Sequence, residues 1–194
     1  MKRTALKFLF IFVAFFLILN GFAFAAMNGL DLDELTKGSD TVVQGTVEKL
    51  IPRWSEDGNK IITTAKVRVS NVVRGNNKYK NKKNGLVEVE YEGGEIGDIG
   101  YKRGDVSILN QGDKVFMFLK AGSVESMDNQ TRGRKNPVAP EDMPHTIVGL
   151  GQGVYKIDRS GVAKKGEFSI VSGHERVKPS MRIEDLTSLV RGVK

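Results

Sequence analysis

The sequence predicts a mainly β domain, a small OB-like barrel with a C-terminal helix. Three observations favour this fold class: β-branched runs that alternate with polar residues, glycines within and between those runs, and one amphipathic helical pattern near the end of the chain. A sandwich of two β-sheets fits the same observations and is the alternative. A length of 194 residues suits one domain.

The N-terminus has the three parts of a secretory signal, which predicts that residues 1–25 form a signal peptide. Basic residues precede the apolar run Phe8–Leu19, and Ala23 and Ala25 supply the small residues that signal peptidase reads. As a helix, this run would be about 18 Å long, whereas the hydrocarbon core of a bilayer is about 30 Å thick. We therefore expect cleavage near Ala25 and no stable membrane insertion. The mature chain, residues 26–194, is then expected in the periplasm or secreted. Its net charge is +4, against +7 for the full sequence.

The first half of the mature chain predicts a short helix and two long strands. Leu30–Leu35 has early acidic residues, which favour a helix N-terminus. Thr41–Ile51 is rich in β-branched residues, and Gly45 within it predicts a bulge or a close backbone approach. An Asp-Gly pair at 57–58 predicts a hairpin turn into Ile61–Val73, a long alternating strand.

The middle of the chain predicts two more strands and two loops. Leu86–Glu92 alternates apolar residues with glutamates and reads as a strand. Gly93–Gly104 contains five glycines, which predicts an irregular loop. Lys114–Leu119 is apolar on both faces and is expected to be a central, covered strand. Residues 121–144 show no period and hold three prolines, which predicts a long exposed loop.

The last part of the chain predicts two strands and a helix. Thr146–Ile157 and Glu167–Val171 are the expected strands, and the apolar spacing from Ile183 to Val193 is typical of an amphipathic helix. No repeat and no second domain boundary is found, so residues 26–194 are expected to form a single β-rich domain.

The first strand pair is similar to the start of the netrin-like, OB-type barrels. The shared pattern covers residues 39–75: a small residue and Asp, a Val-rich strand, then a long strand that ends on a basic residue and Gly. Tissue inhibitors of metalloproteinases belong to this class, so the resemblance implies a partner or inhibitor of a secreted metalloprotease. Those inhibitors chelate the protease zinc through an N-terminal Cys. This chain has no Cys, and no inhibitory residue carries over.

The whole mature chain also resembles a group of small uncharacterised secreted bacterial proteins. The matching segments are Gly93–Gly100, Gly112–Leu119 and Val148–Tyr155. This second resemblance implies export and a β-rich domain, and it implies no activity.

Composition and motifs exclude several chemistries. The absence of Cys excludes disulfides, thiolate catalysis and cysteine-bound zinc, and two His exclude a three-histidine metal site. Neither His145 nor His174 lies in an HExxH segment, and no Ser lies in a GxSxG elbow. We therefore expect no catalytic, cofactor-binding or metal-binding residue, and we expect both histidines to be exposed or structural.

The glycine-rich stretch 93–100 is the most unusual segment. Its candidate binding residues are Gly93, Gly94, Glu95, Gly97, Asp98 and Gly100. Glycines let a ligand reach backbone amides, and Glu92, Glu95 and Asp98 offer oxygen atoms suited to Ca²⁺. The alternative is a tight loop across a barrel end, in which the glycines supply positive φ.

A basic segment follows the second long strand and contains one aromatic residue. Its candidate residues are Lys78, Tyr79, Lys80, Lys82 and Lys83. Such a segment suits an anionic polymer or an acidic membrane surface, and the alternative is a solvated loop. Export and the single ring argue against nucleic acid, because each stacked base needs its own aromatic residue.

Glu88, Glu90 and Glu92 are spaced about 7 Å apart on one face of a predicted strand. That spacing suits the paired carboxylates of a glycosidase, so a carboxylate-dependent polysaccharide hydrolase is one alternative function. Such an enzyme needs an apolar pocket around one carboxyl group. We interpret the three glutamates as a solvated face that guards against edge pairing.

Trp54 lies at the predicted tip of the first hairpin, where it is either an exposed contact for a partner or a cap on the barrel end. Together these features predict an exported, non-enzymatic binding module that uses loops at a barrel end, with the basic segment as an electrostatic aid. The expected partner is another macromolecule, either a protein or an anionic surface polymer. The metalloprotease partner or inhibitor and the hydrolase are the two alternatives.

Overall fold

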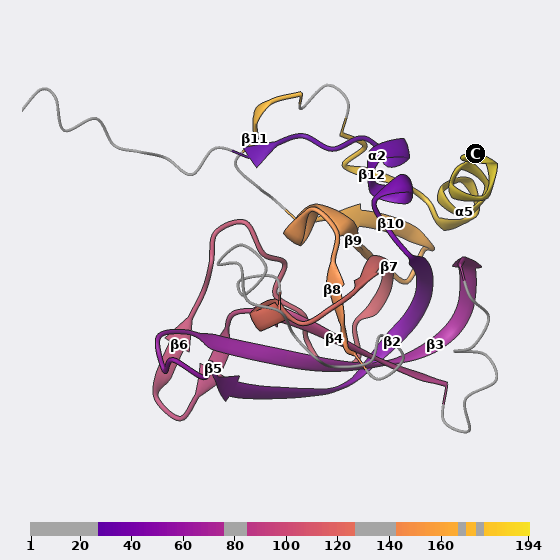
Figure 1. Ribbon diagram of the computed structural model, residues 1–194. Coiled ribbons are helices and arrows are strands. Elements are labelled where there is room, and N and C mark those ends of the chain that lie inside the picture. Colours follow the sequence, from indigo (N-terminus) through magenta and orange to yellow (C-terminus); the bar gives the residue numbers. More distant parts are fainter. Residues whose placement is uncertain (1–26, 76–84, 127–142, 167–169, 174–176) are drawn as a thin grey trace, which may run out of the picture.

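The computed structural model describes residues 27–75, 85–126, 143–166, 170–173 and 177–194 (Figure 1). Within these ranges the main sheet has eight strands in the order β12-β10-β9-β7-β2-β3-β4-β8. Strand β7 also pairs with β8, so β7, β2, β3, β4 and β8 close into a five-stranded barrel. The predicted OB-like barrel is confirmed, and the two-sheet sandwich is wrong.

The barrel strands are β2 (Thr41–Trp54), β3 (Ile61–Arg74), β4 (Leu86–Glu92), β7 (Lys114–Ala121) and β8 (His145–Ile147). Neighbours in the barrel are antiparallel, except that β4 and β8 run parallel. The first three of these strands lie where alternation and β-branched runs predicted them, because half-buried pleated segments leave a clear local pattern. β7 lies where a run that is apolar on both faces predicted a covered strand.

Two local predictions in the first hairpin are confirmed. The register of β2 on β3 shifts at Gly45, where a Cβ atom would overlap the carbonyl oxygen of Arg68. Only glycine lets the strands approach so closely at this bend. The turn is closed by the Ser55 N–H, which donates to the carbonyl of Lys60 at 2.9 Å, and Gly58 has a φ of +69°.

The remaining strands extend the sheet beyond the barrel. β9 (Val154–Ile157), β10 (Val162–Lys165) and β12 (Ser180–Arg182) follow outward from β7. A separate parallel pair joins β1 (Met27–Asn28) to β11 (Ile170–Ser172).

Two predicted strands near the C-terminus need correction. Thr146–Ile157 is not one strand, because a 3₁₀ turn at Leu150–Gly153 separates β8 from β9, and Gly149 before it has a φ of +63°. β8 and β9 therefore pair in succession with one edge of β7, β8 with Leu119–Ala121 and β9 with Val115–Met117, while β2 pairs with the other edge. Of the strand expected at Glu167–Val171, residues 167–169 lie outside the described residues, and the described part belongs to β11.

Two predicted loops are also wrong in their described parts. The stretch 93–104 contains a small hairpin, β5 (Gly94–Ile96) and β6 (Ile99–Tyr101), with a two-residue turn. The stretch 121–144 was expected to be exposed, but Gly122 and Ser126 are buried. Residues 127–142 lie outside the described residues.

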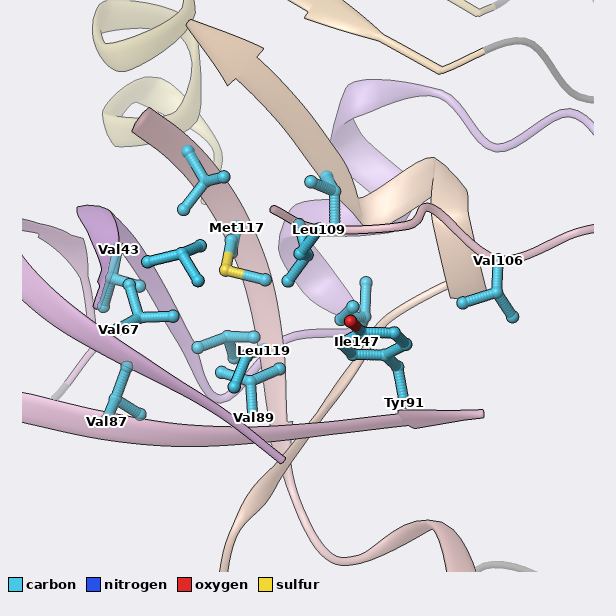
Figure 2. Packing of buried hydrophobic residues seen from close by; sticks show 14 of the residues in the cluster. Val43, Val67, Val87, Val89, Tyr91, Val106, Leu109, Met117, Leu119 and Ile147 are labelled. Atoms are coloured by element: carbon cyan, nitrogen blue, oxygen red, sulfur yellow. The ribbon is translucent and has the colours of Figure 1, made fainter. Parts of the chain in front are cut away.

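Two hydrophobic clusters hold these elements together. The first fills the barrel with aliphatic side chains such as Val67, Val89, Met117 and Leu119, and Tyr91 lies toward one end (Figure 2). Such burial of apolar area is the main stabilising term, at about 25 cal/mol per Å².

The second cluster lies outside the barrel, under α2 (Leu32–Lys37) and α5 (Ile183–Gly192). Leu35 and Leu186 pack there with Phe116, Phe118 and Tyr155. Both predicted helices are confirmed, and α2 begins with a capping box between Asp31 and Glu34. No helix within the described residues has the length and apolarity needed to cross a bilayer.

Candidate functional site

One end of the barrel is hollowed into a pocket of about 410 Å³, named here the mouth pocket. Pro52, Thr63 and Tyr91 are cross-strand neighbours on β2, β3 and β4, and all three line it. Thr63 and Tyr91 each lie two residues nearer the barrel end than the neighbouring pair Ala65 and Val89, which is buried in the barrel core. The pocket therefore continues the barrel interior to the point where core side chains no longer fill it.

The β5–β6 hairpin forms a second wall, and glycines bring it close to β3. The Gly93 N–H donates to the carbonyl of Ile61 at 2.8 Å, and the Thr63 hydroxyl donates to the carbonyl of Gly93 at 2.5 Å. Gly94 has a φ of +137°, and a Cβ atom there would overlap the Thr63 hydroxyl oxygen. These two glycines thus serve a close backbone contact, as the tight-loop alternative expected.

The rest of the lining comes from β2, from the β5–β6 hairpin and from the segment before β7. These residues are Leu50, Glu95, Gly100, Tyr101, Lys102, Ile108, Leu109 and Asn110. The charged members, Glu95 and Lys102, are exposed, whereas Leu109 is almost completely buried. The pocket therefore combines an apolar interior with a polar rim.

The deepest polar groups of the pocket already have partners. Burial raises the pKa of Tyr91, although hydrogen bonds with the Thr63 side chain and the Leu109 backbone oppose that effect. The Thr63 hydroxyl also donates to Gly93. A ligand group that enters the pocket therefore meets few unsatisfied polar atoms, which favours an apolar group.

Glu92 anchors the exit of the hairpin. Its carboxylate accepts a hydrogen bond from the Tyr101 hydroxyl at 2.6 Å and one from Arg103 at 3.0 Å, and the Lys60 ammonium lies 3.8 Å away. The bond to Glu92 raises the pKa of Tyr101, because it stabilises the protonated phenol. Arg103 also pairs with Asp105 at 2.7 Å. This network fixes one side of the rim.

A second network lies around Glu90, two residues before Glu92 on β4. Arg53 pairs with Glu90 at 3.2 Å and with Glu125 at 3.1 Å. Burial acts to raise the pKa of Glu125, but hydrogen bonds from Arg53 and from the Glu56 N–H outweigh it and lower that pKa. The loop after β7 is thereby tied to the tip of the hairpin.

These networks correct the interpretation of the glutamate face. Glu88 is exposed, but Glu90 is buried and the side chain of Glu92 is only 11% exposed. Glu90 pairs with Arg53 and Glu92 with Arg103, whereas a glycosidase needs one carboxyl group in an apolar pocket. The geometry therefore gives the hydrolase alternative no support.

The other candidate residues of the hairpin lie on its exposed side. Gly97 and Asp98 form its turn and do not line the mouth pocket. Within the described part of the chain, no three Asp, Glu or His side chains come together as a metal cluster, so Glu92, Glu95 and Asp98 do not converge.

Trp54 ends β2 two residues after Pro52, on the same face of the strand and about 7 Å further along. Its side chain is 42% exposed. Ile99 on β6 and Ile108 at the pocket are also exposed, by 54% and 44%. Large apolar side chains thus lie open to solvent around the mouth pocket.

The basic segment, with Lys78, Tyr79, Lys80, Lys82 and Lys83, lies outside the described residues. Its flanks are described, and they lie at the other end of β3 from the pocket. A Cβ at Gly75 would contact Thr41 at the start of β2, and Arg74 donates to the carbonyl of Val193 after α5 at 2.7 Å. Trp54 and the glycine hairpin therefore share one barrel end, and Arg74 and Gly75 before the basic segment lie at the other. His145 is buried in β8, and His174 lies outside the described residues.

Sequence reasoning missed several members of the site. Thr63, Tyr91 and Tyr101 are ordinary strand residues whose role depends on the element that crosses over them. Arg53 pairs with Glu125 across a separation of 72 residues, which no local pattern reveals. The sequence feature that does indicate this site is the Gly93-Gly94 pair, which directly follows the regular alternation of Leu86–Glu92 and is typical of a close backbone approach.

Comparison with known proteins finds no family model that matches this chain and no curated protein with a significant match.

Proposed function

We propose that this chain is an exported, non-enzymatic binding module that holds part of another macromolecule in the mouth pocket. The observation that carries the proposal is the pocket itself. Its volume of about 410 Å³ lies within the range of ligand sites, and its interior is apolar with a polar rim.

The surroundings of the pocket support a macromolecular partner. Trp54, Ile99 and Ile108 expose apolar area next to the opening, which is typical of a contact surface. The tip of the β2–β3 hairpin and the β5–β6 hairpin present this area on a rigid barrel, as binding loops commonly are. Export follows from the N-terminal signal pattern and sets the compartment in which the partner is sought.

The test uses the mature chain as bait, with one variant that blocks the pocket and one matched control. A Cβ at Gly100 has room, with its nearest neighbour 3.7 Å away on Glu95, so Gly100→Leu places a side chain against the pocket without backbone strain. Gly104→Leu adds the same side chain outside the pocket, where no atom of the described residues lies within 4 Å of the Cβ position.

Each bait is cross-linked in the culture fluid or periplasm of the producing cells. We expect a partner that wild type and Gly104→Leu retain and that Gly100→Leu loses. Equal retention by all three baits would show that the pocket does not carry the binding.

A further inference from the structure

The charge around the mouth pocket differs in sign from the charge of the whole chain. The acidic end is defined here as residues 53–60 and 90–105 together with Glu125. Its cations Arg53, Lys60 and Arg103 all pair with carboxylates of the same region. The carboxylates in those pairs are Glu90, Glu92, Asp105 and Glu125. Three cations and four carboxylates give the paired set a net charge of −1.

The remaining charges of the acidic end are mostly negative and exposed. Glu56, Asp57, Glu95 and Asp98 face a single further cation, Lys102. Hydrogen bonds from Ser55 and Asn59 lower the pKa of Asp57 to about 2, so it stays ionised at neutral pH. The acidic end thus has a net charge of −4, although residues 26–194 carry +4.

This charge disfavours an anionic ligand in the mouth pocket. A phosphate-rich or acidic polymer would approach exposed carboxylates, and like charges at an interface are costly. The flanks of the basic segment, Arg74 and Gly85, lie on the far side of the barrel from Trp54. The complementary partner is therefore cationic.

We propose that the mouth pocket binds an extended, basic polypeptide segment that presents one large apolar side chain. The apolar side chain enters between Pro52, Tyr91 and Ile108, and flanking lysine or arginine side chains meet Glu95 at the rim and Asp98 in the turn of the β5–β6 hairpin. This inference rests on the proposed function and adds the chemical class of the partner. The apolar contact supplies affinity, and the charges supply selectivity and association rate.

The test uses synthetic peptides without Trp, so that Trp54, the one tryptophan of the chain, reports on binding. The first peptide has a central Phe flanked by lysines. In the second peptide Ala replaces Phe, and in the third peptide glutamates replace the lysines. Binding to the mature chain is measured by calorimetry and by Trp54 emission.

We expect the first peptide to bind and each of the other two to bind at least about tenfold more weakly, with affinity that falls as salt is added. The double variant Glu95→Gln/Asp98→Asn is expected to weaken the first peptide about threefold to tenfold with an unchanged melting temperature. Gly100→Leu should abolish binding, and Gly104→Leu should leave it as in wild type.

Binding of the glutamate peptide as tight as that of the lysine peptide would overturn the inference, as would binding that survives Gly100→Leu. The two proposals fail separately. A partner captured in a Gly100-dependent manner, together with peptides that show no charge preference, refutes the cationic class alone. Capture that is indifferent to Gly100→Leu refutes the pocket as the binding site and the inference with it.

Discussion

Replacement of Gly94 by alanine tests whether the hairpin wall is built on glycine. Gly94 has a φ of +137°, which a residue with a side chain rarely adopts. Its new Cβ would overlap the Thr63 hydroxyl oxygen and would lie 3.4 Å from Ile61 and 3.6 Å from Pro52. The strain therefore falls on backbone and on a buried hydroxyl, neither of which can swing away cheaply.

The expected cost has two parts. Backbone strain at this φ costs about 1–3 kcal/mol. Displacement of Thr63 also breaks its hydrogen bond to the carbonyl of Gly93, which costs about 1 kcal/mol more. Gly94→Ala should therefore lower the free energy of unfolding by about 2–4 kcal/mol and move β5 away from β3.

Urea unfolding of residues 26–194, followed by circular dichroism and Trp54 emission, measures this cost. Gly97→Ala is the matched control, because Gly97 has a φ of +58° but no atom of the described chain lies within 4 Å of its Cβ position. This substitution should therefore cost only about 1 kcal/mol. In a Thr63→Ala background, Gly94→Ala should become cheaper by about 1 kcal/mol. Equal costs at positions 94 and 97, with no coupling to Thr63, would refute the reasoning.

Three further predictions concern buried polar groups. The Gln152 side chain accepts from the Leu30 N–H at 2.8 Å, so Gln152→Leu should cost about 1–3 kcal/mol and speed amide exchange at Leu30; unchanged exchange would contradict this. Arg53 helps lower the pKa of Glu125 below its ordinary value of 4.5. Ionised Glu125 therefore stabilises the fold fully above pH 4.5, and this stabilisation is lost as the pH falls through the lower pKa of the folded state. Glu125→Gln should remove that part of the acid dependence of unfolding, and an unaltered pH profile would count against it. Burial lowers the pKa of Lys165 to about 8, so stability should rise between pH 8 and pH 10.5 as the unfolded state holds more protons. Lys165→Met should raise the free energy of unfolding at pH 7 by about 1–3 kcal/mol and abolish its rise between pH 8 and pH 10.5. Urea titrations at pH 7, 8 and 10.5 measure both effects.

The barrel strands were predictable because each leaves a local signature. Leu86–Glu92 was bounded correctly, since its alternation reflects one buried face along a whole strand. The β8–β9 boundary was missed, because apolar residues continue on both sides of the turn at Gly149, which interrupts the strand without removing that apolar pattern. A pattern of period two shows that a segment can be a strand, but it does not show which strands it joins.

The site was predictable only in part, for a related reason. Trp54 and the glycine pair were singled out because both break the ordinary strand pattern. Glu90 and Glu92 were taken as solvated, because alternation shows which side of a strand a residue is on and not what covers that side. Their environment depends on Arg53, Tyr101 and Arg103, which reach them from other elements.

The amino-acid sequence by itself determined the fold class, the bulge at Gly45, the first hairpin turn and the helices α2 and α5. These features follow from preferences of neighbouring residues. Closure of the barrel decided the rest: it brought the β5–β6 hairpin onto β3 beside Trp54, opened the mouth pocket between them and placed the basic segment's flanks at the other end. Such placement depends on register between strands far apart in the sequence, and no short-range pattern encodes that register.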